Sequence, residues 1–156
     1  MDKSKVTGAG IIAYFDNTDN SIKGLEEDLL FLILIDNSND YDFPKGGIDK
    51  SDNTIFDCAI RETEEEISLN RNDFLRFDSE IDEDGYCCGE KLVLFLGELN
   101  KDSLANTFIG TNPKTLEKEH LDYTWLSYKR IIADKRLKDY LIPGIKWAHK
   151  KINSYR

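Results

Sequence analysis

Residues 43–69 read FPKGGIDKSDNTIFDCAIRETEEEISL. Gly46 and Gly47 end a short loop, and the residues after it predict a helix over about residues 54–67. Apolar residues recur along this helix at i, i+3 and i+4 spacings, which place them on adjoining stripes of its surface. We therefore expect the helix to pack against a hydrophobic core, with the glycine loop leading into it.

Three glutamates of this helix, Glu62, Glu65 and Glu66, fall at i, i+3 and i+4 and so converge one turn apart. Like charges at this spacing destabilise an isolated helix by roughly a few tenths of a kcal/mol, and near its C-terminal end they oppose the helix dipole. The spacing alone leaves two interpretations open: a solvated acidic face, or a site for a hard divalent cation, which prefers oxygen ligands. In the second, a loop carbonyl at Gly46 or Gly47 would add a ligand.

The whole stretch resembles the signature box of the Nudix hydrolases. That box reads Gly, five residues, Glu, seven residues, and then Arg-Glu-apolar-x-Glu-Glu-x-Gly-apolar. Residues 61–69, RETEEEISL, match its second half, and Gly47 lies at the expected distance upstream. The resemblance implies an α/β/α sandwich with a mixed β-sheet, in which the box forms a loop, a helix and a second loop.

Two departures from the box bear on its geometry. The first-half glutamate is replaced by Asn53, or by Asp52 if Gly46 is the box glycine, and Ser68 replaces the closing glycine. In the family that glutamate mainly supports the box arginine. With Asn53 in its place, Arg61 is expected to be held less firmly, whereas the metal ligands are unaffected.

The resemblance assigns the three helix glutamates to a site for Mg²⁺ or Mn²⁺. Such a site would neutralise a phosphate chain and lower the pKa of a bound water. One carboxylate, or a neighbour, would remove the proton of the water that attacks a pyrophosphate bond. Arg61 belongs to the same catalytic group, and Lys45, one residue before the glycines, is placed to meet a phosphate.

Beyond the box, the chain looks like the Nudix hydrolases that cleave dinucleoside tetraphosphates such as diadenosine tetraphosphate. Those enzymes carry a base-stacking tyrosine downstream of the box, where this chain has Tyr86, and residues 119–125, EHLDYTW, match their later strand. The resemblance implies that Glu119 is a further metal ligand or base. It also implies that Tyr86, with Tyr123 or Trp125, holds the nucleobase, and that diadenosine tetraphosphate is hydrolysed asymmetrically to ATP and AMP.

Other functions stay open. Residues 43–46 (FPKG) and 57–62 (DCAIRE) also look like the boxes of mRNA-decapping and diphosphoinositol-polyphosphate Nudix enzymes. Under that reading, residues 127–156 would grip RNA or a polyphosphorylated inositol, because they hold nine Lys/Arg against two Asp/Glu in a chain of net charge −9. A non-catalytic nucleotide-binding Nudix module is the alternative from another class. It would be expected to lack a box glutamate, yet all three are present.

The rest of the chain predicts the elements around the box. Strands are expected at residues 5–15, 28–36, 74–81, 91–99 and 121–126, and helices at about 127–133 and 141–155. Gly8 and Gly10 in the first strand are positions where another backbone can approach closely. The acidic residues 82–89 predict a turn.

The length of 156 residues suits one domain over residues 1–156. No stretch approaches the roughly 18 apolar residues that a membrane span needs, and the charged N-terminus shows no signal peptide. Cys58, Cys87 and Cys88 lack metal-type spacing and are interpreted as reduced thiols. We therefore expect an intracellular, cytoplasmic protein whose partner is a nucleotide or polyphosphate, without a membrane. The oligomeric state is not predicted.

Overall fold

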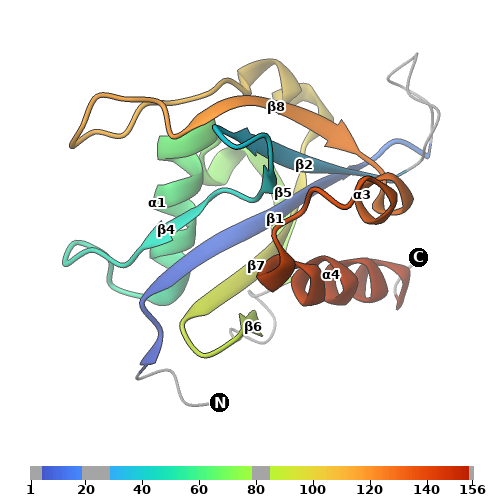
Figure 1. Ribbon diagram of the computed structural model, residues 1–156, viewed down its shortest axis with the longest axis horizontal. Helices are drawn as coiled ribbons and strands as arrows, with labels where there is room; N and C mark the ends of the chain where they lie inside the picture. The colour runs from blue at the N-terminus through green and yellow to red at the C-terminus, as the bar shows by residue number, and fades with distance from the viewer. Residues whose placement is uncertain (1–4, 19–28, 79–84, 155–156) are drawn as a thin grey trace.

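The computed structural model describes residues 5–18, 29–78 and 85–154, which form one mixed sheet with helices on both faces (Figure 1). The strands are β1 (Gly8–Asp16), β2 (Leu29–Asp36), β3 (Tyr41–Asp42), β4 (Lys45–Gly47), β5 (Phe74–Phe77), β6 (Tyr86–Cys88), β7 (Leu92–Leu99) and β8 (His120–Leu126). The helices are α1 (Ile55–Ile67), α3 (Tyr128–Asp134) and α4 (Ile142–Ser154), with short 3₁₀ helices η2 (Arg71–Asp73), η3 (Lys101–Asn106) and η4 (Asp139–Leu141).

The sheet is built around β1, which pairs in parallel with β7 and antiparallel with β2 and β4. Its main path runs β3-β2-β1-β7-β5, while β6 adds to β7 and β8 adds to β2. The pairing of β8 with β2 shifts register after Ile35, so that His120 comes to face Asp36. This shift places the start of β8 beside the short strands that precede α1.

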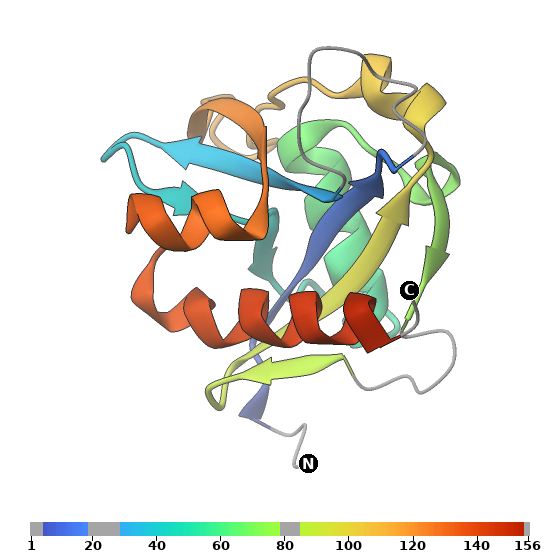
Figure 2. The same ribbon diagram turned by 90° about the vertical axis from the view of Figure 1, so that its right-hand side faces the viewer.

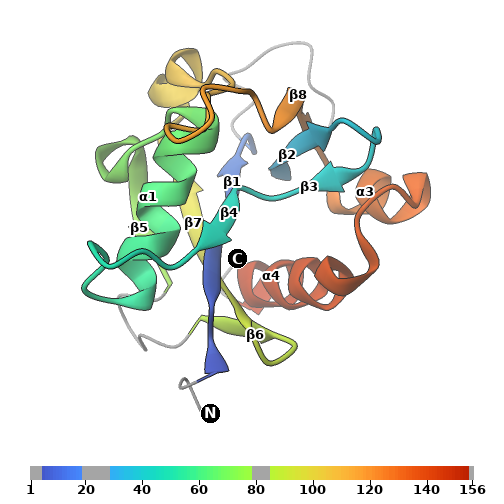
Figure 3. The ribbon, with the colours of Figure 1, turned by 60° about the vertical axis from the view of Figure 1, so that its left-hand side comes forward.

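Residues of β1 alternate between two hydrophobic cores, as a strand buried on both faces requires. Ile11 and Phe15 pack in the core that contains α1, and Ile12 and Tyr14 pack in the core that contains α3 and α4. Figures 2 and 3 show α4 on the face of the sheet opposite α1. The expected α/β/α sandwich with a mixed sheet is therefore confirmed.

The glycines of β1 allow β4 to lie directly against it. A Cβ atom on Gly8 would stand 2.8 Å from the carbonyl oxygen of Gly46, and one on Gly10 would stand 2.4 Å from that of Pro44. Larger residues there would push β4 away. The close approach that the sequence predicts at Gly8 and Gly10 is confirmed, and it fixes the loop that leads into α1.

Both ends of α1 are capped. The Thr54 hydroxyl accepts a hydrogen bond from the Asp57 amide at 3.0 Å, which satisfies one free N–H of the first turn. At the other end Ser68 adopts a left-handed conformation with φ 68°, where the Nudix box has glycine. Its hydroxyl donates to the carbonyl oxygen of Phe108 at 3.0 Å, so the side chain joins α1 to the segment before β8.

The long elements match the prediction more closely than the short ones. The expected strands at 5–15, 28–36, 91–99 and 121–126 correspond to β1, β2, β7 and β8. The strand expected at 74–81 ends earlier, at Phe77, and its predicted end at Ile81 lies outside the described residues. The turn predicted at 82–89 is wrong in part, because Tyr86–Cys88 pair with β7 as β6. Strands β3 and β4 were not predicted, since two or three residues show no periodicity.

Among the described residues no helix is both long and apolar enough to cross a membrane. Cys58, Cys87 and Cys88 are free thiols, as the sequence suggested. The predicted terminal helix begins at Ile142, one residue later than expected, and Pro143 occupies its first turn. Its predicted end at Tyr155 lies outside the described residues.

Candidate active site

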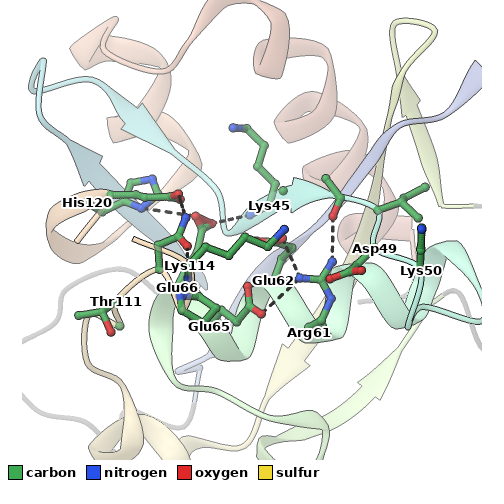
Figure 4. Close-up of a pocket in the computed structure, with 17 residues that line it drawn as sticks. Lys45, Asp49, Lys50, Arg61, Glu62, Glu65, Glu66, Thr111, Lys114 and His120 are labelled. Carbon is green, nitrogen blue, oxygen red and sulfur yellow. Dashed lines mark hydrogen bonds and ion pairs between the residues drawn. The ribbon is translucent and has the colours of Figure 1, made fainter. Parts of the chain in front are cut away.

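A cavity of about 480 Å³ opens where β4, α1 and the segment before β8 meet (Figure 4). It is lined by residues 45–50, by the α1 residues Arg61, Glu62, Glu65 and Glu66, and by residues 110–114, 119 and 120. Three segments far apart in the sequence thus share one polar cavity. The glycine at 110 helps to join them, because a Cβ there would stand 1.9 Å from the carbonyl oxygen of Glu65.

The three glutamates of α1 all line this cavity. Glu66 is the most deeply buried of them, with 7% of its surface exposed, and its Oε1 accepts a hydrogen bond from the backbone N–H of Lys45 at 2.8 Å. Gly46 packs against Glu62 so closely that a Cβ at that position would stand 2.2 Å from the carboxyl carbon. The glycine loop is therefore fitted to the carboxylates beneath it.

The environment of these carboxylates disfavours their negative charge. Burial is the main cause that raises the pKa of Glu66, and the charges of Glu62, Asp42 and Glu119 add to it. The hydrogen bond from the backbone of Lys45 opposes them, and together these effects bring the pKa to about 9. Burial also raises the pKa of Glu62, and the charge of Glu65 adds to this effect. A cation in the cavity would reverse these shifts by stabilising the ionised forms.

Arg61 is held by the residue that the sequence left undecided. Its Nε and Nη2 donate to the two oxygens of Asp52 at 2.9 and 2.8 Å, which is a bidentate pair. Its Nη1 lies 3.0 Å from Glu62 and 3.3 Å from Glu65. Asp52, and not Asn53, thus supports the box arginine, and the expectation that Arg61 is held less firmly is wrong.

The cavity fits a divalent cation in its chemistry, because carboxylate oxygens are the ligands that Mg²⁺ and Mn²⁺ prefer. The residues that could hold such an ion are Glu62, Glu65, Glu66 and Glu119. Within the described part of the chain, no three carboxylate, imidazole or thiol groups already lie close enough together to bind one metal ion. In this arrangement Arg61 serves as a counter-ion of Glu62 and Glu65.

The two glycine carbonyls that were expected to add ligands have partners within the protein. The Gly46 oxygen accepts from the thiol of Cys58 at 3.6 Å, and the Gly47 oxygen accepts from Nη2 of Arg61 at 2.8 Å. Glu119, on the opposite wall, is exposed and accepts from the amide of Asn112 at 2.6 Å.

The lysine expected to meet a phosphate points elsewhere. The ammonium group of Lys45 lies 3.2 Å from Asp42 and 5.7 Å from the ring centre of Tyr140. Figure 4 shows its side chain directed away from the carboxylates. Two lysines that the sequence reasoning missed, Lys50 and Lys114, also line the cavity. They stand in loops without periodicity, and no spacing in the sequence marks them.

The structure does not bring the three predicted base-stacking residues to this cavity, whose lining includes none of them. Tyr86 stacks on Trp147 of α4 with ring centres 5.4 Å apart, on the other face of the sheet. Trp125 packs edge-on against Phe15 in the core, and the Tyr123 hydroxyl donates to the carbonyl oxygen of Thr107 at 2.9 Å. Their placement favours packing roles.

A family model described as the NUDIX domain matches residues 18–148. Among solved structures, a C. elegans Ap4A hydrolase binary complex superposes with a TM-score of 0.67 at 20% identity, covering 96% of this chain and 99% of that one. A Nudix hydrolase of M. smegmatis, RenU, gives 0.69 at 11% identity, covering 97% and 88%. The NUDIX domain of Shewanella oneidensis NrtR, complexed with ADP ribose, gives 0.59 at 12% identity, covering 97% and 90%. These identities speak for the fold alone, and no curated protein matches the sequence significantly.

Proposed function

The chain belongs to the Nudix family, and from this premise we propose that it is a metal-dependent pyrophosphohydrolase that acts on a nucleotide-type substrate. The observation that carries the proposal is the convergence of Glu62, Glu65 and Glu66 on one cavity, where burial and mutual repulsion favour a bound cation. Arg61 balances part of the charge of Glu62 and Glu65, but the buried Glu66 beside them is ionised only at a cost in free energy. A bound cation would offset that cost, which makes it the simplest explanation of the cluster.

The charged residues of α1 and Glu119 have distinct roles in this proposal. When bound, Mg²⁺ or Mn²⁺ would supply Lewis acidity toward the phosphates and a more acidic water. Glu62, Glu65, Glu66 and Glu119 would be its ligands, and one of these carboxylates would accept the proton of the attacking water. Arg61 would keep the carboxylates in place.

Lys50 and Lys114 would bind phosphate oxygens of the substrate from two walls of the cavity. These two lysines would have the phosphate-binding role that was expected of Lys45, whose ammonium group forms an ion pair with Asp42. Phosphates would therefore provide most of the recognition, since lysine binds them as a compact point charge.

The finer proposal is that a dinucleoside tetraphosphate, such as diadenosine tetraphosphate, is cleaved asymmetrically to ATP and AMP. The match of residues 119–125 to that subgroup supports it, because Glu119 and His120 both line the cavity. The fold shared with the C. elegans Ap4A hydrolase agrees with it. The placement of Tyr86 argues only against that residue as the base-stacking group.

The decapping alternative is less favoured by the arrangement of charge. Much of the basic part of the chain belongs to α3 and α4, which cover the sheet face opposite α1 (Figure 3). RNA held there would have to pass around the sheet to reach the cavity. A diphosphoinositol phosphate is small enough to bind in the cavity without such a path. It remains the second candidate, because lysines line the cavity and none of the three predicted base-stacking aromatic residues does.

The test is to incubate the protein with Mg²⁺ and, in separate reactions, diadenosine tetraphosphate, capped RNA and a diphosphoinositol phosphate. Glu66→Gln is the inactive variant. Glu64→Gln is the matched control, because Glu64 belongs to the same helix but is exposed and outside the cavity lining. ATP and AMP from the first substrate, lost in Glu66→Gln alone, are expected. Turnover of another substrate alone would reassign the specificity, and no turnover of any would contradict the proposal.

A further inference from the structure

A carboxylate outside the cavity lining forms the centre of a buried charge network next to it. Asp42, at the end of β3, is 2% exposed. Its oxygens lie 2.9 Å from Nζ of Lys138, 3.2 Å from Nζ of Lys45 and 3.4 Å from Nε2 of His120. These partners come from the connection between α3 and η4, from β4 and from β8, so one aspartate joins four parts of the chain.

This carboxylate is ionised in the folded protein. Burial opposes its charge, but the hydrogen bond from His120 and the nearby charges of Lys45 and Lys138 outweigh burial and lower the pKa of Asp42. The backbone N–H of Phe43 donates to it as well, at 2.9 Å. An ionised carboxylate only accepts hydrogen bonds, so Nε2 of His120 must carry the proton that faces it.

The other nitrogen of the same imidazole faces the cavity. Nδ1 of His120 lies 3.6 Å from Oε2 of Glu66, while Oε1 of Glu66 is bound by the backbone N–H of Lys45. The two oxygens of Glu66 are therefore contacted by Lys45 and by His120, and the side chains of both residues also contact Asp42. His120 is itself 6% exposed, so its ring has little freedom to turn.

We propose that Asp42 is a positioning residue of the active site, which orients the His120 ring and, through it, the Glu66 carboxylate. Lys138 ties the connection between α3 and η4 to Asp42, and its ammonium group also lies 3.0 Å from Asp36 at the end of β2. The inference rests on the proposed function and adds to it two residues, Asp42 and His120, that act behind the glutamates.

The first test separates catalytic rate from substrate binding. Asp42→Asn keeps the size of the side chain but removes the charge, and it should lower kcat by about 10- to 100-fold, as loss of a partner behind a metal ligand typically does. KM should change little, because Asp42 does not line the cavity. Lys138→Met should give a smaller loss in the same direction.

The matched control is Asp73→Asn. Asp73 is also buried, at 6% exposure, and it accepts hydrogen bonds from Asn70 and Asn106 outside the cavity lining. Its replacement should lower stability without a selective loss of kcat. Equal kcat in Asp42→Asn and Asp73→Asn would overturn the inference.

The second test needs no substrate or metal. Long-range proton–nitrogen spectra of the metal-free protein report which imidazole nitrogen is protonated, and the chain holds only two histidines, so His120→Gln assigns the signals. The wild-type ring of His120 should carry its proton on Nε2. In Asp42→Asn this preference should weaken, whereas His149 should keep its signals. An unchanged His120 spectrum would refute the inference.

This readout also separates the two proposals. If no substrate is turned over, the proposed function fails, but the ring spectrum still decides whether Asp42 orients His120. If Asp42→Asn does not fold, Lys138→Met takes its place in both tests, because its side chain is 27% exposed and tolerates replacement better. A wild-type spectrum and kcat in that variant would then refute the inference.

Discussion

Arg61 has two sets of partners, and together they define the charge balance of the site. Asp52 and the Gly47 carbonyl hold one edge of its guanidinium, while Glu62 and Glu65 take the other. A guanidinium suits this position because it is planar, always charged and presents several donors in fixed directions. Two carboxylates of α1, those of Glu62 and Glu65, are therefore held by an internal cation.

Asp52→Asn should lower kcat by about 10-fold or more, because a neutral amide cannot form the bidentate charged pair with Arg61. Asn53→Ala is the control, at the exposed neighbour that also could have filled the box position. It should leave the rate within about twofold, as surface changes usually do. Steady-state kinetics on the preferred substrate decide the matter, and a larger loss in Asn53→Ala than in Asp52→Asn would contradict the assignment.

Glu66 should make the metal-free protein less stable as the pH rises. Its pKa is about 9 in the folded protein against an ordinary value of 4.5, so between these values the unfolded chain loses a proton that the folded state keeps. Its stabilising contribution is complete below 4.5 and is lost as the pH rises toward 9.

Urea unfolding with a chelator present, from pH 5 to 9, is the measurement. The free energy of unfolding should fall more steeply with pH in the wild type than in Glu66→Gln, by up to about 1.4 kcal/mol per pH unit. Parallel curves for the two proteins would show that Glu66 is ionised in the fold.

At the scale of elements, the loop before α1 is placed by backbone contact. Strand β4 is short, and it lies against β1 only because Gly8 and Gly10 have no side chains. The same loop then packs Gly46 onto the carboxylate of Glu62. The three-residue strand β4 thus fixes the position of α1 and its glutamates relative to the sheet.

Gly10→Ala should therefore destabilise the protein by about 1–3 kcal/mol, since its Cβ would stand 2.4 Å from a backbone oxygen that cannot move without shifting β4. Gly47→Ala is the matched substitution, because its Cβ would meet only the Thr7 oxygen, at 3.8 Å. Urea denaturation of both variants tests the claim. Equal stabilities would mean that β4 does not depend on the glycine.

At the scale of the whole molecule, much of the architecture was predictable because it depends on long periodic segments. Apolar runs marked β1, β2 and β7, and the spacing of three glutamates marked the cavity face of α1. The network around Asp42 could not be predicted, since Asp42 and His120 meet only after β8 has paired with β2. Tyr86 was misplaced because distance along the chain does not say which face of the sheet a strand presents.

Mg²⁺ should stabilise the folded protein as a whole if it binds the glutamates of α1. Ligand present at about 100 times its dissociation constant adds about 2.7 kcal/mol to the free energy of unfolding. The effect should raise the melting temperature of wild type and Glu64→Gln, and it should be small in Glu62→Gln. Differential scanning calorimetry with and without Mg²⁺ measures it. Equal shifts in all three proteins would place the ion elsewhere.

Hydrolysis of diadenosine tetraphosphate in isotopically labelled water, with Mg²⁺ titrated from zero, tests most directly whether the glutamates of α1 form a metal-dependent hydrolytic site. No reaction is expected without the metal. With it, ATP and AMP should form, and one of them should carry a single labelled oxygen at the cleaved bond. Glu66→Gln should abolish the reaction and Glu64→Gln should not. Cleavage that ignores Mg²⁺, or that survives in Glu66→Gln at the wild-type rate, would contradict the claim that the glutamates of α1 form a metal-dependent hydrolytic site.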